Sequence, residues 1–276
     1  MRAALEPLVE TLLYEGYALY PYTPGAVKNA TPTPFGIVYP PIHARGSNAG
    51  FDHLRLECIA EAPAGAAFDV EVRFLHATGT GNEATARSLA VDAFRLRASA
   101  SAQTRRARWG GDAGEPALDV ALEVVGEPRG EERWHVRVEL RNETAAPSAA
   151  AADRWSALPH AMLSVHVVLE LGAGRFVSPL ETEGRGCRNV NTWPVLASPD
   201  DDVLVGAAIV LPDHPELSPQ SLGSLFDGTE IEEALWLHLQ TLSPDELAAI
   251  AESDPTVRDA VDRARTAAAP DVERLH

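Results

Sequence analysis

The chain has 276 residues, of which 45% are apolar and 23% are charged, a composition typical of a globular protein with a sizeable core. Its formal net charge of −17 argues against nucleic acid and anionic lipid as partners, because both are bound through clustered cations. The sequence has neither an apolar run long enough to span a bilayer nor the pattern of a secretory signal, so we expect a cytoplasmic protein without membrane insertion.

A helix is predicted at the start of the chain. Over residues 3–14 the apolar side chains follow the i, i+3, i+4 spacing of an amphipathic helix, namely Leu5, Leu8, Val9, Leu12 and Leu13. Pro7 falls early, where the first turn of a helix tolerates proline. Between residues 21 and 41 prolines recur too often for a helix or a central strand. This pattern predicts an extended, turn-rich segment anchored by its aromatic side chains.

The middle of the chain alternates apolar and polar residues with the two-residue period of β-strands. Residues 68–76 form one such stretch. Residues 118–125 and 134–142 flank a turn rich in glycine, proline and arginine, and together predict a hairpin. Residues 163–171 and 175–180 flank a glycine turn and predict a second hairpin.

Further strands and helices are predicted towards the C-terminus. The run at residues 203–211 is apolar on both faces and suits a central, covered strand, and residues 233–242 alternate again. Ser243 and Asp254, each followed by proline, then begin two helices. The predicted fold class is therefore α+β, with a β-sandwich-like antiparallel core and helices at the N- and C-termini.

The alanine-rich stretch at residues 144–153 decides the domain organisation. It is either a linker, which splits the chain into domains 1–143 and 154–276, or a long loop within one sandwich. We favour a single α+β domain over residues 1–276, because the strands on the two sides resemble each other and neither side alone has enough of them for a stable sheet.

All five tyrosines and the single lysine of the chain lie in one stretch near the N-terminus, between residues 12 and 41. Every other cation is an arginine, so Lys28 suggests a need for a compact ammonium group. With Asn29 and the tyrosine hydroxyls it could hold a small anionic ligand. The aromatics could instead form a packed seam, with Lys28 paired to Glu15. The sequence leaves both alternatives open.

Cys58 and Cys187 are the only cysteines, and we expect both to be reduced thiols. Cys187 lies in a glycine-flanked loop between two arginines, and nearby cations can lower a thiol pKa and favour the reactive thiolate. A nucleophile also needs a positioned base, for which His160 and His166 are candidates only if the fold brings them close. No common nucleotide-binding, zinc-protease or serine-hydrolase motif is present, so no catalytic residue is assigned beyond the candidates Lys28 and Cys187.

Acidic residues and one histidine gather at residues 211–233, where carboxylates and an imidazole could bind a divalent metal. His214, Asp227 and Glu230 are the candidate ligands. Turn and helix-cap chemistry around Gly228 accounts for several of these residues without a metal. We therefore assign no metal site and expect no cofactor.

Six arginines make residues 87–108 basic within an acidic chain: Arg87, Arg95, Arg97, Arg105, Arg106 and Arg108. They form either an internal ion-pair surface or a docking patch for an acidic partner.

Four stretches together resemble a protein family encoded beside high-affinity, oxygen-tolerant NiFe hydrogenases in actinobacteria and relatives. They are LYEGYALYPYTPGAVKN, FGIVYP, CRNVNTWPVL and the segment from LPDHPE to LSPDE, and the resemblance runs from about residue 13 to the C-terminus. The resemblance implies a genomic neighbourhood more than a mechanism. The binding residues it implies are Tyr14, Glu15, Tyr17, Tyr20, Tyr22, Lys28, Asn29, Tyr39, Asn189 and Trp193.

The resemblance and the missing enzyme motifs favour a non-catalytic accessory protein of a NiFe hydrogenase system, acting in assembly, maturation or as a scaffold. Its expected partners are hydrogenase subunits or other maturation proteins. One alternative is an enzyme that uses Lys28 or Cys187 on a small anionic or carbonyl substrate. Another is a metal-handling protein that uses the His214 segment.

Overall fold

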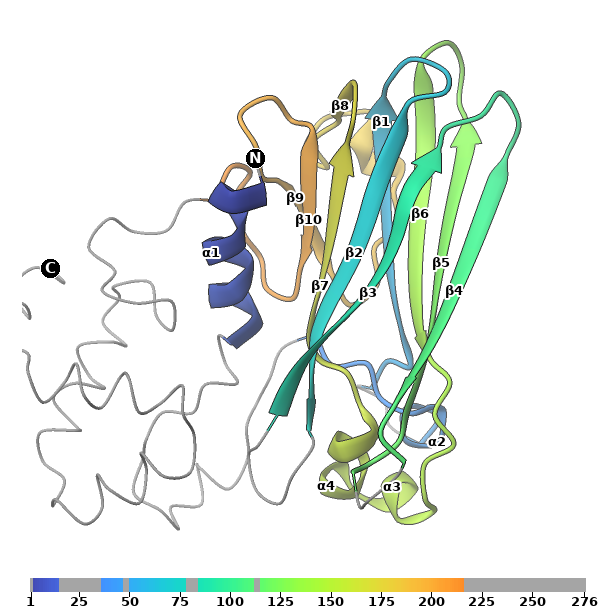
Figure 1. Ribbon diagram of the computed structural model, residues 1–276, viewed down its shortest axis with the longest axis vertical. Coiled ribbons are helices and arrows are strands. Elements are labelled where there is room, and N and C mark those ends of the chain that lie inside the picture. Colours follow the sequence, from blue (N-terminus) through green and yellow to red (C-terminus); the bar gives the residue numbers. More distant parts are fainter. Residues whose placement is uncertain (1, 15–35, 47–49, 78–83, 112–114, 216–276) are drawn as a thin grey trace, which may run out of the picture. The chain divides into compact units, whose positions relative to one another are not determined.

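The computed structural model describes residues 2–14, 36–46, 50–77, 84–111 and 115–215 (Figure 1). The described residues from 36 onwards belong to one compact unit, and helix α1 (Arg2–Tyr14) belongs to a second. Helix α1 confirms the helix predicted over residues 3–14. Leu8, Val9, Leu12 and Leu13 are buried, as its apolar spacing predicts.

Pro7 is not in the first turn of α1, as the sequence suggested. The helix begins at Arg2, which makes Pro7 its sixth residue. The remaining C-terminal elements predicted from sequence, the strand at residues 233–242 and the helices from Ser243 and Asp254, lie outside the described residues.

The larger unit is built from two five-stranded sheets whose neighbouring strands are all antiparallel, which confirms the predicted sandwich-like α+β class. Sheet I has the order β4 (Ser101–Trp109), β5 (Leu118–Pro128), β6 (Arg133–Asn142), β1 (His53–Glu61), β8 (Arg175–Phe176). Sheet II has the order β3 (Ala84–Arg95), β2 (Ala67–Ala77), β7 (Leu163–Leu171), β10 (Val203–Ala207), β9 (Trp193–Leu196).

The core lies between the two sheets and is formed by the apolar half of each alternating strand. Its largest fully buried side chains include Phe68, Phe74, Leu122, Leu140 and Phe176. Each such side chain contributes roughly 1.5–3 kcal/mol by leaving water. Strand β10 takes up the first five residues of the run predicted at residues 203–211 and is buried at all five positions, as expected for a covered central strand. The rest of that run is not strand, and Val210 is 72% exposed.

The first predicted hairpin is confirmed, because β5 pairs with β6. The second is wrong. Strand β7 pairs with β2 and β10 in sheet II, whereas β8 pairs with β1 in sheet I, with Ala60 opposite Phe176. Gly174, at φ +103°, directs the chain from one sheet to the other. The glycine turn therefore predicted a reversal of the chain but not the strand it pairs with.

Short helices gather at one end of the sandwich (Figure 1). They are α2 (Pro41–Ala44), α3 (Ala149–Ala152), α4 (Arg154–Ala157) and the 3-10 turn η1 (Leu158–His160); a second 3-10 turn, η2 (Gly184–Gly186), follows β8. The alanine-rich stretch contains α3. Both sheets take strands from before and after this stretch, so it is a connection within the sandwich.

Ion pairs cover the outer face of sheet I. At its centre Glu139 is only 2% exposed and accepts hydrogen bonds from three arginines. Arg55 donates from Nε at 3.1 Å and Arg137 from a terminal nitrogen at 3.2 Å, while Arg141 donates from Nε at 2.6 Å. Burial alone raises the pKa of the Glu139 carboxyl, but Arg141 and Arg55 outweigh burial, and the net pKa is lowered.

Candidate functional site

The two open sides of the sandwich differ in strand length, and the residues predicted to carry function divide between them. On one side β8 and β9 have two and four residues. On the other side β3 and β4 have twelve and nine residues. We call these the short edge and the long edge (Figure 1).

At the short edge, the segment between β8 and β9 lies along β1. The backbone of Arg55 exchanges two hydrogen bonds with that of Val190, with N···O distances of 3.0 and 2.8 Å. Next along the chain, the Glu57 amide donates to Oδ1 of Asn189 at 2.8 Å, and the Arg188 amide donates to Oε2 of Glu57 at 2.8 Å. The candidate binding residue Asn189 thus holds this segment on β1.

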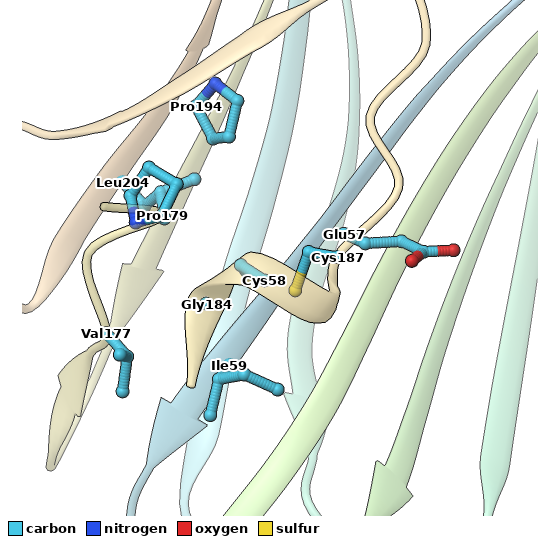
Figure 2. Close-up of a pocket in the computed structure, with 9 residues that line it drawn as sticks. All are labelled: Glu57, Cys58, Ile59, Val177, Pro179, Gly184, Cys187, Pro194 and Leu204. Atoms are coloured by element: carbon cyan, nitrogen blue, oxygen red, sulfur yellow. The ribbon is translucent and has the colours of Figure 1, made fainter. Parts of the chain in front are cut away.

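A crevice lies between this segment and β1 (Figure 2). It is lined by Glu57, Cys58, Ile59, Val177, Pro179, Gly184, Cys187, Pro194 and Leu204. The crevice brings the two cysteines together. It has no enclosed room even for a water molecule, so it does not hold a small substrate as it stands.

Both thiols in the crevice are protonated at neutral pH. Burial raises the pKa of Cys187 to about 11, and the Glu57 carboxylate acts in the same direction against the weaker opposing effect of Arg129. Burial also raises the pKa of Cys58 well above its ordinary value. The sequence raised the possibility that neighbouring arginines favour a thiolate at Cys187; burial and Glu57 instead keep this thiol protonated.

The two histidines considered as bases do not line this crevice. His166 is buried; its Nδ1 bonds the Ser164 carbonyl at 2.8 Å, and its Nε2 accepts from the Ala208 amide at 3.5 Å. Burial lowers the pKa of His166 to about 4, so it stays neutral as part of the core. Nδ1 of His160 bonds the carbonyl of Ala117 at 3.1 Å.

Two further candidate binding residues have structural contacts. Tyr39 is buried, and its ring lies 4.5 Å from that of His43. Trp193, at the short edge, is 41% exposed, and its Nε1 donates to the Leu211 carbonyl at 3.2 Å. Trp193 is therefore the more accessible of the two.

The N-terminal candidates fall outside what the structure describes. Tyr14 ends helix α1, and its side chain is not described. The others outside the described residues are Glu15, Tyr17, Tyr20, Tyr22, Lys28 and Asn29. The tyrosine segment and its lysine remain sequence-based predictions.

Of the metal-ligand candidates, His214 is described and Asp227 and Glu230 are not. Nε2 of His214 lies 2.9 Å from Oδ1 of Asp201, which makes an ion pair when the imidazole is protonated. Within the described ranges, no three side chains of histidine, cysteine, aspartate or glutamate are grouped as metal ligands would be.

The basic run found in the sequence lies on the long edge. Strand β3 pairs only with β2, and β4 pairs only with β5, so each has one side without a partner strand in the two sheets. Residues 84–109 contain six arginines and a single acidic residue, Asp92. Trp109 packs edge-on against Phe74 at 5.4 Å and fixes β4 to the core.

The arginines of the long edge are only partly neutralised. Arg87 pairs with Glu115 at 2.6 Å, Arg106 with Glu143 at 3.1 Å and Arg108 with Asp119 at 3.5 Å. Arg95 donates to the carbonyl of Gly65 at 3.3 Å and has no carboxylate partner among the described residues. Arg97 and Arg105 are exposed, and no ion pair within the described part of the chain engages either one.

Comparisons with protein-family models and with curated proteins gave no match to this chain. In the part of the chain that the structure describes, no helix is long and apolar enough to cross a bilayer.

Sequence reasoning missed that Cys58 faces Cys187. The signal was present in part, because residues 53–60 alternate polar and apolar side chains as a strand does. Which segment lies beside that strand depends on the tertiary fold. The partner carboxylates of the basic run, Glu115, Asp119 and Glu143, were likewise not evident from the sequence.

Proposed function

We propose that this chain is a non-catalytic accessory protein of a NiFe hydrogenase system, acting in assembly, maturation or as a scaffold. We further propose that it binds an acidic, extended segment of its partner along the long edge. The sequence resemblance supports the hydrogenase assignment. The observation that carries the binding mode is the pair of long edge strands with uncompensated arginines.

An edge strand offers backbone N–H and C=O groups that an extended segment can pair with, as in β-strand addition. Strands β3 and β4 are long enough for an added segment of typical strand length. The exposed guanidinium groups of Arg95, Arg97 and Arg105 then supply charge-assisted hydrogen bonds to carboxylates of that segment. Backbone pairing gives affinity, and the arginines select an acidic sequence.

The charge distribution directs such a partner to one side of the molecule. The chain as a whole carries a formal charge of −17, which repels an acidic partner from most of its surface. Among the described residues, the long edge is the region of this acidic chain where positively charged side chains predominate. Attraction there and repulsion elsewhere favour a single binding orientation.

The enzyme alternative receives less support. The crevice around Cys187 lacks room for a substrate and a histidine to act as base, and the raised pKa of Cys187 disfavours a thiolate. The metal-handling alternative needs His214 as a ligand, but Nε2 of His214 already contacts Oδ1 of Asp201 in the structure.

The proposal is tested by mild affinity purification of the tagged protein from its native host, with mass spectrometry of retained proteins. The informative variant reverses two charges on the long edge, Arg97→Glu with Arg105→Glu. A matched control reverses two exposed arginines elsewhere, Arg45→Glu with Arg185→Glu, and so makes the same change in net charge.

We expect wild type and the control to retain hydrogenase subunits or their precursors, and the edge variant to lose them. Equal retention by the edge variant would refute the binding mode. Absence of all hydrogenase components from the wild-type eluate would refute the hydrogenase assignment. Added salt should weaken retention, because the pairing is between exposed charges.

A further inference from the structure

The two cysteines occupy opposite positions on adjacent segments. Arg55 and Val190 form an antiparallel bridge. Counting outward from this pair, Glu57 falls opposite Arg188 and Cys58 falls opposite Cys187. The hydrogen bond from the Arg188 amide to the Glu57 carboxylate shows that the two segments stay adjacent as far as this step.

The position is of the kind that accommodates a cross-strand disulfide. In a regular ladder, counting from the hydrogen-bonded pair Arg55 and Val190 makes Cys58 with Cys187 a non-hydrogen-bonded pair. Here the bridge is isolated, because the amides of Glu57 and Arg188 bond side chains instead of each other's backbone. Opposite Cα atoms at such a pair lie about 4.5 Å apart in a regular ladder. A disulfide requires a Cα separation of roughly 4.4–6.8 Å.

The crevice brings both cysteine side chains into one mostly apolar environment in which a disulfide could form. Cys58 and Cys187 line the same crevice among apolar neighbours (Figure 2). In the structure both thiols are free. Gly186, which precedes Cys187, has open space where a side chain would be.

We propose that Cys58 and Cys187 are a redox modification site, and that they form a reversible intramolecular disulfide which fastens the segment between β8 and β9 to β1. The oxidant is a small-molecule disulfide. This inference is independent of the proposed function, since it concerns the short edge and needs no partner protein.

The reaction proceeds by two thiol–disulfide exchanges. The Cys187 thiolate attacks one sulfur of the small-molecule disulfide, forms a mixed disulfide and releases the first small thiol. The Cys58 thiolate then attacks the Cys187 sulfur and releases the second. The protein loses two electrons and two protons, and the small-molecule disulfide is reduced to two thiols.

The order of the two attacks follows from accessibility. Cys58 is 4% exposed, whereas Cys187 is only partly buried. The pKa of Cys187, about 11, makes the thiolate scarce at neutral pH. The first step should therefore speed up about tenfold for each pH unit between pH 7 and 9.

The test uses the full chain, reduced and then incubated with oxidised glutathione at about pH 8.5. After an acid quench, remaining thiols are labelled with a maleimide in denaturant, and the intact mass is measured. We expect a monomer that has lost two hydrogen atoms and takes up no maleimide. Because the chain has only these two cysteines, that product identifies the bond. Two labelled thiols, a lasting glutathione adduct or a disulfide-linked dimer would each refute the proposal.

Two variants and one condition separate the proposal from chance oxidation. Cys58→Ala should stop at a glutathione adduct on Cys187, and Cys187→Ser should keep one free thiol. In urea the same cysteines are joined only by a long unfolded loop. The disulfide of the folded chain should therefore survive at a glutathione ratio roughly 1000-fold more reducing than the disulfide of the unfolded chain does. The same midpoint in both conditions would contradict a preformed pair.

Discussion

The two edges of the sandwich differ in the length of their outer strands and in what lies beside them. The short edge ends in strands of two and four residues, and a connecting segment lies along β1 beside it. The long edge ends in strands of twelve and nine residues, each with no partner strand on one side within the two described sheets, and it carries arginines. Short or covered edges resist pairing with other chains, whereas a long open edge is available for it. Under the proposed function, the short edge is closed internally and the long edge binds the partner.

The largest expected effect is at the short edge. Closing the Cys58–Cys187 disulfide would tie β1 to a segment roughly 130 residues later, and should raise the free energy of unfolding by about 4 kcal/mol. Urea denaturation of the oxidised and reduced chain measures the difference. Cys187→Ser should give one curve under both conditions. No gain in the oxidised wild type would mean that the short edge is not constrained by the bond.

The second prediction compares an ion pair away from the long edge with one on it. Glu139→Gln leaves three arginines facing a neutral side chain and should cost about 3 kcal/mol of unfolding free energy. Glu143→Gln, whose partner Arg106 is 67% exposed, should cost less than about 0.5 kcal/mol. Similar losses for both variants would contradict the expectation that the exposed Arg106–Glu143 ion pair contributes less stability than the buried Glu139 cluster.

Acid should affect the same variants unequally. The folded-state pKa of Glu139 lies below its usual value of 4.5, so its stabilising contribution is complete above about that pH and is lost as the pH falls through the folded-state pKa. Wild type and Glu143→Gln should therefore lose stability below about pH 4.5. Glu139→Gln should lose less over the same range, which thermal unfolding at a series of pH values would measure.

A third prediction tests how tightly the short edge is packed. A side-chain carbon at Gly184 would clash with the Ser178 carbonyl oxygen and lie 2.8 Å from Cα of Pro179, so Gly184→Ala should cost about 2–3 kcal/mol. Gly186, two residues later in the same turn, meets nothing, and Gly186→Ala should change stability by less than about 1 kcal/mol. Equal tolerance at both positions would show that the segment yields easily.

The smallest effect on stability is expected at the long edge. Arg97→Glu with Arg105→Glu removes no described ion pair, so the free energy of unfolding should change by at most about 0.5 kcal/mol. Chemical denaturation checks this value. A loss of several kcal/mol would mean that these arginines support the fold, and that lost binding in the same variant reports unfolding.

Strands with one buried face could be predicted from the sequence, because burial imposes the two-residue period. This holds for residues 68–76, 118–125 and 134–142. Residues 163–171 show the same period in sequence although β7 is buried at eight of its nine positions. Strands β3 and β4 were missed because an edge strand is exposed at most positions, so little in it is forced to be apolar. The pairing of β8 with β1 depends on the position of a distant strand, which local turn chemistry does not specify.

The candidate site divides in the same way. The basic run at residues 87–108 was evident from composition, and the structure places it along one edge. The thiol chemistry of Cys187 was not evident, because sequence neighbours suggested cations whereas the folded surroundings supply burial and Glu57. The cysteine pair depends on two segments about 130 residues apart, and no local pattern announces such a contact.

The strand order has a consequence for how the protein is made. Strand β2 finds a partner in β3 as soon as the next few residues have been synthesised, but β1 borders only β6 and β8, both far later in the chain. As the polypeptide leaves the ribosome, sheet II can begin to assemble while β1 exposes Leu54 and Leu56 without a neighbour. Such long-range pairing makes folding slow, on the millisecond-to-second scale typical of β-sandwiches. The slowest step in folding of the sandwich should be the insertion of β1 between β6 and β8.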